Sequence, residues 1–479
     1  MTRQTADIQV SDASGYFPQS AMRETFSVAV IGAGAAGIAV AKCLRQARLD
    51  FHIFERHSDF GGVWDIAAPG SPMYESAHLI SSRATSSFSD YPMDARLPDY
   101  PSHRQVLAYL RSYARLHRLY DSASFGVAVT SVTSDGPRWS VHTVSGRKFT
   151  FDAVVCTTGK YWDPVMPDFA EAALAEATTG CRIMHARDYK DGTSLAGQRV
   201  LVVGGGNSAA DIACDAAIHA AQASISVRRG YHFMPKYLLG IPTTVLADRF
   251  PAWLPFRLQQ TLLASVLRGT VGSPEQFGLP KPDHGILESH PVVNSRILHH
   301  CAHGDLKVRS DVVSISGKQV SFSDGSCGVF DTVICATGYE ERLPFLHDDM
   351  LPKKDGRPDL YLHMFNAERP TLILMGMVEI DNGALPVFEA CAEVIAHYLK
   401  DKALGSVHAE QLERLMHLRP RTHGNRKLLK LRRHANYVHK PDYLAQLRHL
   451  HKLFGWRTLL SLTNSDEALP DQLLTEGRS

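Results

Sequence analysis

The sequence lacks the features that mark secreted, metal-binding and membrane-spanning proteins. Its eight cysteines are scattered and include no C-x-x-C pair, which argues against a disulfide framework, a zinc ribbon and a dithiol redox centre. No segment approaches the ~18 consecutive apolar residues of a membrane-spanning helix. Residues 1–24 also lack the basic start, apolar core and cleavage site of a signal peptide. We therefore expect a cytoplasmic protein with a polar N-terminal arm over 1–24, no transmembrane segment and no metal site.

An excess of charge of one sign is also missing. The 51 Lys and Arg residues nearly balance 49 Asp and Glu, so the composition favours no nucleic-acid or polyanionic partner. A local exception is residues 414–433, which hold eight Lys or Arg and no carboxylate. This stretch is either a site for an acidic partner or an anionic membrane, or a solvated helix face above apolar leucines. The second interpretation, with the leucines beneath the charged face, is favoured.

The strongest positive signal is a glycine-rich turn between a predicted strand and a predicted helix. An apolar run ends at Ile31, and Gly32, Gly34 and Gly37 then follow the G-x-G-x-x-G spacing. In such a turn the first glycine permits the sharp bend, the second lets a pyrophosphate approach the backbone, and the third lets helix and strand pack closely. A second strand, F-H-I-F, ends at Glu55, where a carboxylate can accept hydrogen bonds from a ribose. This order predicts a dinucleotide-binding unit.

The same pattern returns in the middle of the chain. Residues 198–213 read Q-R-V-L-V-V-G-G-G-N-S-A-A-D-I-A, with Gly204, Gly206 and Ala209 at the three fingerprint positions. The next strand ends at Arg228 and Arg229 instead of at a carboxylate. A guanidinium pairs with a 2′-phosphate, so the second nucleotide is expected to be NADPH in preference to NADH. The alternative is a pair of solvated arginines at a strand end.

Three other stretches suggest function less directly. The G-G-V-W segment at 61–64 either lays an indole against a flat cofactor or supplies a core tryptophan. The turn-rich segment 74–93 predicts a long loop, and such loops are usually functional. The amphipathic stretch 253–268 could line a substrate entrance or rest on a membrane surface, but burial against its own domain is favoured.

Domain boundaries follow from these repeats. The segments D-A-V-V-C-T-T-G at 152–159 and D-T-V-I-C-A-T-G-Y at 331–339 each resemble the last strand of a nucleotide-binding half. The predicted fold is therefore α/β, with two Rossmann-like dinucleotide-binding domains, the second inserted into the first. We expect the first domain over 25–163, the inserted NADPH domain over 164–330, and the returning part with C-terminal helices over 331–479.

These motifs together resemble the class B flavoprotein monooxygenases, in particular the flavin-containing monooxygenase branch, from about Phe26 to Tyr443. The matching pieces are V-I-G-A-G-A-A-G, E-R with G-G-V-W, F-S-D-Y-P, T-T-G, H-A-R-D-Y-K, G-G-G-N-S-A-A-D and A-T-G-Y. His185, Tyr189 and Lys190 fit the second half of the family fingerprint. Thr179 and Cys181 stand where that fingerprint has Phe and Gly. The Tyr-Lys pair leans away from the typical Baeyer-Villiger branch.

A second departure concerns the loop after Tyr74. Aligned without a gap, the family's flavin-side Asn falls on Ile80, with Leu79 in place of the preceding Thr. Ile cannot donate or accept a hydrogen bond, so an oxygen adduct on the flavin would lose that polar support. Here and at 100–114 the chain is similar to the plant YUCCA-type enzymes, which oxidatively decarboxylate an α-keto acid.

The resemblance implies an FAD- and NADPH-dependent monooxygenase. Its small-molecule substrate would be a soft nitrogen or sulfur nucleophile, a carbonyl compound or a keto acid, and its oxidant O2 acting through a flavin C4a-(hydro)peroxide. Alternatives are an NADPH oxidase that releases H2O2 because of Ile80, and a non-catalytic flavoprotein whose redox state gates a partner. No arrangement of side chains predicts an acid or base, so no catalytic residue is named. No feature predicts the oligomeric state.

The expected cofactor-binding residues come from both halves of the chain. Those of the first half are Gly32, Ala33, Gly34, Ala36, Gly37, Glu55, Arg56, Gly62, Val63, Trp64, His78, Val129 and Thr158. Those of the second half are Gly204, Gly206, Asn207, Ser208, Ala209, Arg228 and Arg229, with Thr337 and Gly338 near the domain junction. Asn207 and Ser208 begin a helix, so simple helix capping is the alternative role for these two residues.

Overall fold

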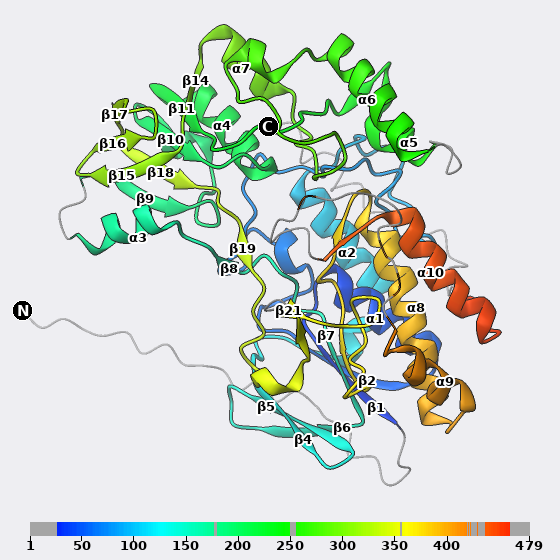
Figure 1. The fold of residues 1–479 in the computed structure, drawn as a ribbon. Coiled ribbons are helices and arrows are strands. Elements are labelled where there is room, and N and C mark those ends of the chain that lie inside the picture. Colours follow the sequence, from blue (N-terminus) through cyan, green and yellow to red (C-terminus); the bar gives the residue numbers. More distant parts are fainter. Residues whose placement is uncertain are drawn as a thin grey trace, which may run out of the picture.

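The computed structural model describes residues 26–176, 180–249, 255–354, 357–418, 420, 422, 429 and 436–459. The expected N-terminal arm, Thr179 and most of the basic stretch 414–433 lie outside these residues. The described chain forms two lobes, each built on a five-stranded parallel sheet (Figure 1). None of the helices in the described part combines the length and the apolar character that crossing a bilayer requires.

The first sheet holds the N-terminal fingerprint at its centre. Its order is β22-β7-β1-β2-β3, with bounds Leu372–Leu374, Ala153–Cys156, Ser27–Ile31, Asp50–Phe54 and Ala123–Ser124. Side chains of β1 alternate between two buried cores, with Val28 and Val30 on one face and Ala29 and Ile31 on the other. The first face packs against α1 (Ala35–Gln46) and α8 (Ala384–Ala403). The second face packs against the antiparallel sheet of β4 (Val129–Asp135), β5 (Arg138–Thr143) and β6 (Lys148–Phe151).

The second sheet repeats this plan. Its order is β14-β11-β10-β18-β9, with bounds Leu306–Arg309, Gln222–Ser226, Arg199–Val203, Thr332–Cys335 and Arg182–His185. One face packs against α4 (Asn207–His219) and α7 (Arg296–His303). The other face packs against α3 (Asp168–Ala175) and the small antiparallel sheet of β15 (Val312–Ser316), β16 (Gln319–Phe322) and β17 (Cys327–Val329). The duplication that the two fingerprints predicted is therefore present in three dimensions.

The chain passes between the lobes twice, and the two crossings lie side by side. β8 (Asp163–Pro164) pairs with β19 (Tyr339–Glu340) in an antiparallel ribbon between the lobes (Figure 1). The first crossing is where the sequence placed a boundary, near Asp163. The expected boundary after residue 330 falls before β18, yet β18 pairs with β10 and β9 in the second sheet. The return to the first lobe therefore follows Cys335.

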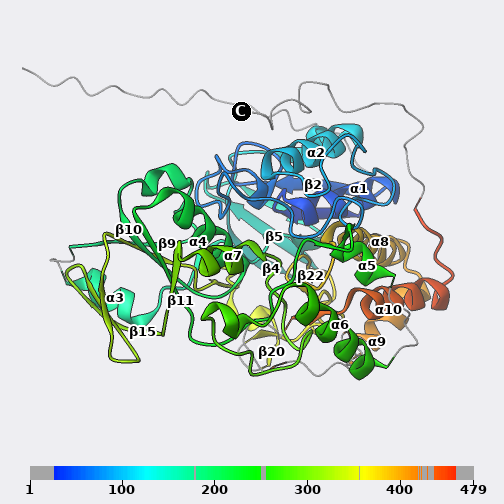
Figure 2. The ribbon, with the colours of Figure 1, turned by 90° about the horizontal axis from the view of Figure 1, so that it is seen from above.

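The remaining helices close the space beside the junction. Figure 2 shows α5 and α6 of the inserted lobe on the same side as α8 and α10. Three short strand pairs are also present: β12 (Tyr237–Leu238) with β13 (Ile241–Pro242), β20 (Lys353–Lys354) with β21 (Arg357–Pro358), and β23 (Glu379–Ile380) with β24 (Tyr437–Val438). The helices not yet given bounds are α2 (His103–Leu116), α5 (Thr243–Asp248), α6 (Phe256–Thr270), α9 (Val407–Leu415) and α10 (Lys440–Leu453). Ser102 caps α2 through a capping box with Gln105.

Helix α6 is less buried than the amphipathic pattern suggested. Leu267 is buried in a small core with Met234, Leu238 and Ile286. Leu258, Leu262 and Val266 are 46%, 46% and 43% exposed. The favoured interpretation, burial of the apolar face against its own domain, therefore holds for Leu267 and not for these three residues.

Candidate functional site

The first glycine turn forms a cradle that tolerates no side chain at two positions. Gly32 has a φ of +106°, and a Cβ there would lie 2.9 Å from the Thr157 carbonyl oxygen. A Cβ on Gly37 would lie 2.0 Å from the Gly32 carbonyl oxygen, so only glycine lets α1 pack this closely on the turn. Helix α1 begins after Gly34, which has no side chain to cap it. Its first backbone N–H groups are therefore available to an anion such as a pyrophosphate.

Glu55 fixes the shape of this cradle. Its carboxylate, 5% exposed, accepts hydrogen bonds from the backbone N–H of Ala33 at 2.7 Å and of His57 at 2.8 Å. Each carboxylate oxygen has a second lone pair, which a ribose hydroxyl can use. The acid that ends β2 thus lies where the sequence expected it, beside the glycine turn.

The G-G-V-W segment covers the cradle. It forms a short 3-10 helix over Gly62–Trp64, and a Cβ on Gly62 would lie 2.8 Å from Gly34 Cα. The Gly61 N–H donates to the Ala33 carbonyl at 3.1 Å. Ala36, the second residue of α1, is buried, and a Cβ added to Gly376 would lie 2.9 Å from the Cβ of Ala36. The loops that contain Gly62 and Gly376 therefore pass so close to the start of α1 that a side chain at either glycine would clash with it.

Three further candidates of the first half lie at different depths. The Thr158 hydroxyl is buried, and no described residue forms a hydrogen bond with it. The Arg56 guanidinium stacks over Trp162 at 4.2 Å, and burial lowers its pKa. Val129 begins β4, pairs with Thr143 and packs against the second face of the sheet. Thr158 offers a ligand an unused hydroxyl group, whereas Val129 contributes to a core.

The second glycine turn repeats the geometry of the first. Gly204 has a φ of +137°, and a Cβ there would lie 2.4 Å from the Ala336 carbonyl oxygen. Helix α4 begins after Gly206, which again has no side chain to cap it. The Asn207 side chain turns away to accept a hydrogen bond from the Val293 N–H at 2.8 Å. Ser208 is exposed and Ala209 is buried.

The two arginines after β11 differ in their surroundings. Arg229 Nη2 donates to both carboxylate oxygens of Asp283, at 2.9 and 3.2 Å. Arg228 is exposed and forms no hydrogen bond or ion pair with another described residue. A 2′-phosphate would therefore find one free guanidinium and one that is already paired.

The H-A-R-D-Y-K motif connects the parts of the site. The His185 imidazole contacts the Gly338 carbonyl at 3.0 Å through Nε2 and accepts from the Arg187 N–H through Nδ1. The Tyr189 hydroxyl donates to Asp215 of α4 at 2.9 Å. Lys190 donates to the carbonyls of Ser71 and Met73 in the loop of the first lobe. Each matching residue of the motif therefore holds a different segment at the junction.

Sequence reasoning missed a set of buried ties from this loop to α4. The Tyr74 hydroxyl donates to Asp211 at 2.9 Å, and Asn294 donates to the other oxygen of the same carboxylate at 2.6 Å. Burial raises the pKa of Asp211. Ser76 donates to Asp215. The only signal in the sequence was the helical spacing of Asp211 and Asp215, which places both on one face of α4.

A cavity of about 1680 Å³ lies at the junction of the lobes. Twelve of the expected cofactor-binding residues line it: Val63, Trp64, His78, Gly204, Gly206, Asn207, Ser208, Ala209, Arg228, Arg229, Thr337 and Gly338. The other ten are not part of its wall: Gly32, Ala33, Gly34, Ala36, Gly37, Glu55, Arg56, Gly62, Val129 and Thr158. The second cradle thus opens directly into the cavity, and the first reaches it through Ala35, Val63 and Trp64.

Apolar side chains of the inserted lobe form much of the remaining wall. Leu246 of α5 and Leu262, Leu263 and Val266 of α6 line the cavity, together with Ile80 of the long loop. Ile80 is 39% exposed. Among the described residues no group of three or more His, Cys, Asp or Glu side chains is arranged to hold a metal ion. The cavity therefore suits an organic molecule beside a nucleotide.

Comparisons with known proteins agree with this geometry. A family model described as flavin-binding monooxygenase-like matches residues 25–473. Flavin-containing monooxygenase 5 of Oryctolagus cuniculus is 31% identical over 468 residues, which cover 93% of this chain and 86% of the relative. Indole-3-pyruvate monooxygenase YUCCA1 of Oryza sativa subsp. japonica is 31% identical over 337 residues, which cover 68% of this chain and 80% of the relative.

A solved structure gives the same fold. The flavin-containing monooxygenase from Stenotrophomonas maltophilia superposes with a TM-score of 0.60 at 23% identity, covering 79% of this chain and 99% of that chain. At this identity the likeness concerns the fold alone.

Proposed function

Because this chain belongs to the flavin-binding monooxygenase-like family, we propose that it oxygenates a small organic substrate in the cavity at the lobe junction. The substrate would be a soft nitrogen or sulfur nucleophile, a carbonyl compound or a keto acid. The family resemblance, the fold with two dinucleotide-binding domains, and the FAD and NADPH cofactors expected from the sequence are confirmed. The chain is an FAD-dependent, NADPH-using monooxygenase.

The residues of the first cradle fit FAD. The uncapped start of α1 offers N–H groups to the diphosphate, and the Glu55 carboxylate has lone pairs left for a ribose. The unpaired Thr158 hydroxyl offers a ligand a hydrogen-bonding group, and at Gly32, Gly37 and Gly62 a side chain would clash with the backbone that shapes the cradle. The chemistry that bound FAD supplies is acceptance of a hydride from NADPH and activation of O2.

The second cradle would hold NADPH. The start of α4 receives its diphosphate, and Arg228 pairs with its 2′-phosphate. The observation that carries the proposal is the cavity itself. Its wall includes the second cradle, Val63 and Trp64 beside the first cradle, and the apolar residues of α5 and α6. Both nucleotides and an organic substrate can therefore meet in one space at the junction of the lobes.

The experiment that tests this proposal follows the oxygen atom. FAD-loaded protein is mixed with NADPH and ¹⁸O₂, with a thioether, a tertiary amine, a ketone or an α-keto acid in separate reactions. We expect one ¹⁸O atom in the product of at least one class, at about one product per NADPH. NADPH oxidation without label in any of the four products would show that the proposal is wrong.

The second candidate function is an oxidase that releases H2O2, and it is favoured by a specific observation. Ile80 lies on the cavity wall with an apolar side chain, where the family resemblance places a hydrogen-bonding Asn. The measurement is the yield of H2O2 per NADPH in the wild type, Ile80→Asn and the apolar control Ile80→Leu. For an oxidase the yield is near one in the wild type and in Ile80→Leu, and lower in Ile80→Asn. A low yield in all three proteins excludes this candidate.

A further inference from the structure

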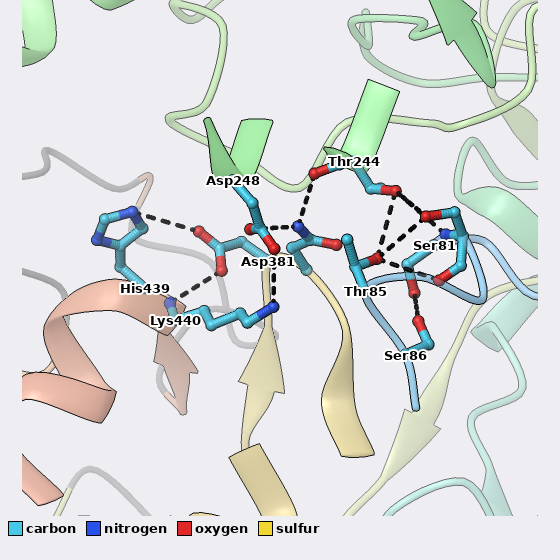
Figure 3. Close-up of polar contacts among 10 residues, drawn as sticks. Ser81, Thr85, Ser86, Thr244, Asp248, Asp381, His439 and Lys440 are labelled. Carbon is cyan, nitrogen blue, oxygen red and sulfur yellow. Dashed lines mark hydrogen bonds and ion pairs between the residues drawn. The ribbon is translucent and has the colours of Figure 1, made fainter. Parts of the chain in front are cut away.

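A polar cluster forms one part of the cavity wall, where four segments from both lobes meet. Figure 3 shows Ser81, Thr85 and Ser86 of the long loop, Thr244 and Asp248 of α5, and Asp381, His439 and Lys440. Thr244 Oγ1 accepts from the Ser82 N–H at 3.1 Å, which joins α5 to the long loop. No nucleotide-binding residue expected from the sequence belongs to this cluster.

Asn382 is the member of the cluster with an unused polar atom. Its side-chain nitrogen donates to the Thr244 carbonyl at 3.0 Å and to Asp248 Oδ1 at 2.7 Å. Both partners can only accept, so the orientation of the amide is fixed and both of its N–H groups are used. Asn382 is 8% exposed and lines the cavity, yet no described residue donates to its Oδ1. A buried carbonyl without a donor is costly unless a ligand or water supplies one.

The charges around Asn382 also favour a donor. In the cluster Asp248 and Asp381 supply two carboxylates and Lys440 one ammonium group, while Arg249 lines the adjacent wall and His439 Nε2 lies 3.7 Å from Asp381 Oδ2. Lys440 Nζ lies 3.1 Å from Asp248 Oδ2, and the Lys440 backbone N–H donates to Asp381 Oδ1 at 3.0 Å. The Asp248 side chain remains 37% exposed. The Asp248 carboxylate is therefore the acidic group of the cluster that a donor can still reach.

The same cavity offers the apolar surface that a substrate with a polar end would need. Leu246 lies on the same helix as Thr244 and Asp248, and Leu262 and Val266 of α6 continue the wall. The segment from Gly376 to Gly383 runs from the first cradle, beside Ala36, to Asn382. The polar cluster and the first cradle are thus connected by the seven consecutive residues from Gly376 to Asn382.

We propose that Asn382 and Asp248 bind the hydrogen-bond-donating end of the substrate, a protonated amine or a hydroxyl group, at a distance from the atom that is oxygenated. The apolar residues of α5 and α6 hold the chain between the two ends. This inference rests on the proposed oxygenation of an organic substrate, and it names a feature by which that substrate is selected.

The test uses three thioethers of matched length: 6-(methylsulfanyl)hexan-1-amine, 6-(methylsulfanyl)hexan-1-ol and heptyl methyl sulfide. Their binding to oxidised, FAD-loaded protein without NADPH is measured by calorimetry, so that no turnover is needed. Sulfoxide formation with NADPH and O2 is then measured separately. We expect the amine and the alcohol to bind more tightly than heptyl methyl sulfide, which has no donor.

Two variants of one ion pair give opposite predictions. Asp248→Asn should reduce the preference for the amine over heptyl methyl sulfide by about 5-fold, because it removes a carboxylate. Lys440→Met should raise that preference by about 5-fold, because it releases the same carboxylate and keeps the backbone N–H that binds Asp381. Lys318→Met removes an ammonium that pairs with Asp331 at 2.9 Å outside the cavity wall, and it serves as the control with no expected change.

A purely structural contact between the lobes predicts another result. Asp248→Asn and Lys440→Met would then weaken the binding of all three thioethers by the same factor, and the proposed subsite would be wrong. Failure of every probe to bind at its solubility limit would also overturn it. Binding with the expected pattern but without sulfoxide would leave the subsite standing and would count against thioether oxygenation. Sulfoxide formation with equal effects of both variants would count against the subsite alone.

Discussion

Arg229 is bound by Asp283 through both carboxylate oxygens, at 2.9 and 3.2 Å. Its neighbour Arg228 has no such partner among the described residues and lies on the cavity wall. From the sequence, both arginines were expected to pair with a 2′-phosphate in the same way. Because their surroundings differ, we expect them to contribute unequally to the recognition of a 2′-phosphate.

The first prediction concerns nucleotide preference. Arg228→Ala should weaken NADPH binding by about 10-fold or more, because a charge-assisted hydrogen bond is lost. Arg229→Ala should have a smaller effect, and Asp283→Asn should tighten NADPH binding by releasing Arg229. The measurement is the ratio of KM for NADPH and NADH in each variant, with NADH as the internal control. Equal losses in Arg228→Ala and Arg229→Ala would contradict this assignment.

The second prediction separates folding from cofactor binding in the first cradle. Gly37→Ala should prevent folding, because its Cβ would lie 2.0 Å from the Gly32 carbonyl oxygen. Gly34→Ala should fold, because its Cβ meets Gly62 Cα at an ordinary 3.6 Å. It should nevertheless bind FAD weakly, because the new methyl group occupies the path of the diphosphate. Circular dichroism and the flavin content of the purified proteins measure the two effects. A Gly34→Ala protein that retains a full complement of FAD would contradict the cradle.

The third prediction concerns the tie between the long loop and α4. Tyr74→Phe removes the hydroxyl that donates to the half-buried Asp211 and should lower the free energy of unfolding by about 1–2 kcal/mol. The control is Tyr237→Phe, which removes a hydroxyl bound to Asp99 on the exposed surface and should cost less than about 0.5 kcal/mol. Urea unfolding of both variants measures the difference. Equal losses of stability in the two variants would contradict a larger contribution from the Tyr74–Asp211 hydrogen bond.

The fourth prediction is a loss of stability in acid. Burial lowers the pKa of His185 from 6.5 to about 4. The neutral ring also fits its partners, since Nδ1 accepts from the Arg187 N–H and only Nε2 needs a proton to donate to the Gly338 carbonyl. Between pH 6.5 and 4 the unfolded chain therefore binds a proton that the folded chain does not. Stability that is fully present above pH 6.5 should fall as the pH drops, by up to about 3 kcal/mol at pH 4.

The measurement is the free energy of unfolding as a function of pH for the wild type and His185→Gln. The variant should show a shallower slope between pH 6.5 and 4. His449→Gln replaces an exposed histidine of α10 and should leave the slope unchanged. If the free energy of unfolding depends on pH equally in His185→Gln and the wild type, the loss of stability in acid is caused by other groups.

The sequence predicted the parts of the fold that depend on local patterns. The first strand, its glycine turn, helix α1 and Glu55 all follow from spacing and hydrophobic periodicity within about 30 residues. The pairing of Arg229 with Asp283 joins positions 54 apart, and no local pattern indicates it. Strand β18 was expected as the last strand of a nucleotide-binding half, and it does pair with β10 in the second sheet. The domain boundary was nevertheless placed before it, because its neighbours β9 and β10 come from distant parts of the chain.

The candidate site shows the same division. The glycine positions were evident because a close backbone approach excludes every other residue. The polar cluster around Asn382 could not be predicted, because it assembles from four segments that share no motif. The exposure of Leu262 and Val266 on α6 depends on what the rest of the molecule leaves uncovered. Amphipathic spacing tells which residues share a face and not what that face meets.

The pairing of β8 with β19 has a mechanical consequence. Two separate linkers would let the inserted lobe swing about either of them, whereas two linkers joined as one ribbon bend together. Rotation of one lobe against the other must therefore twist a single strap, whose strands contain Asp163 and Tyr339. Since Thr337 and Gly338 directly precede that strap, any such rotation would carry their part of the cavity wall with it.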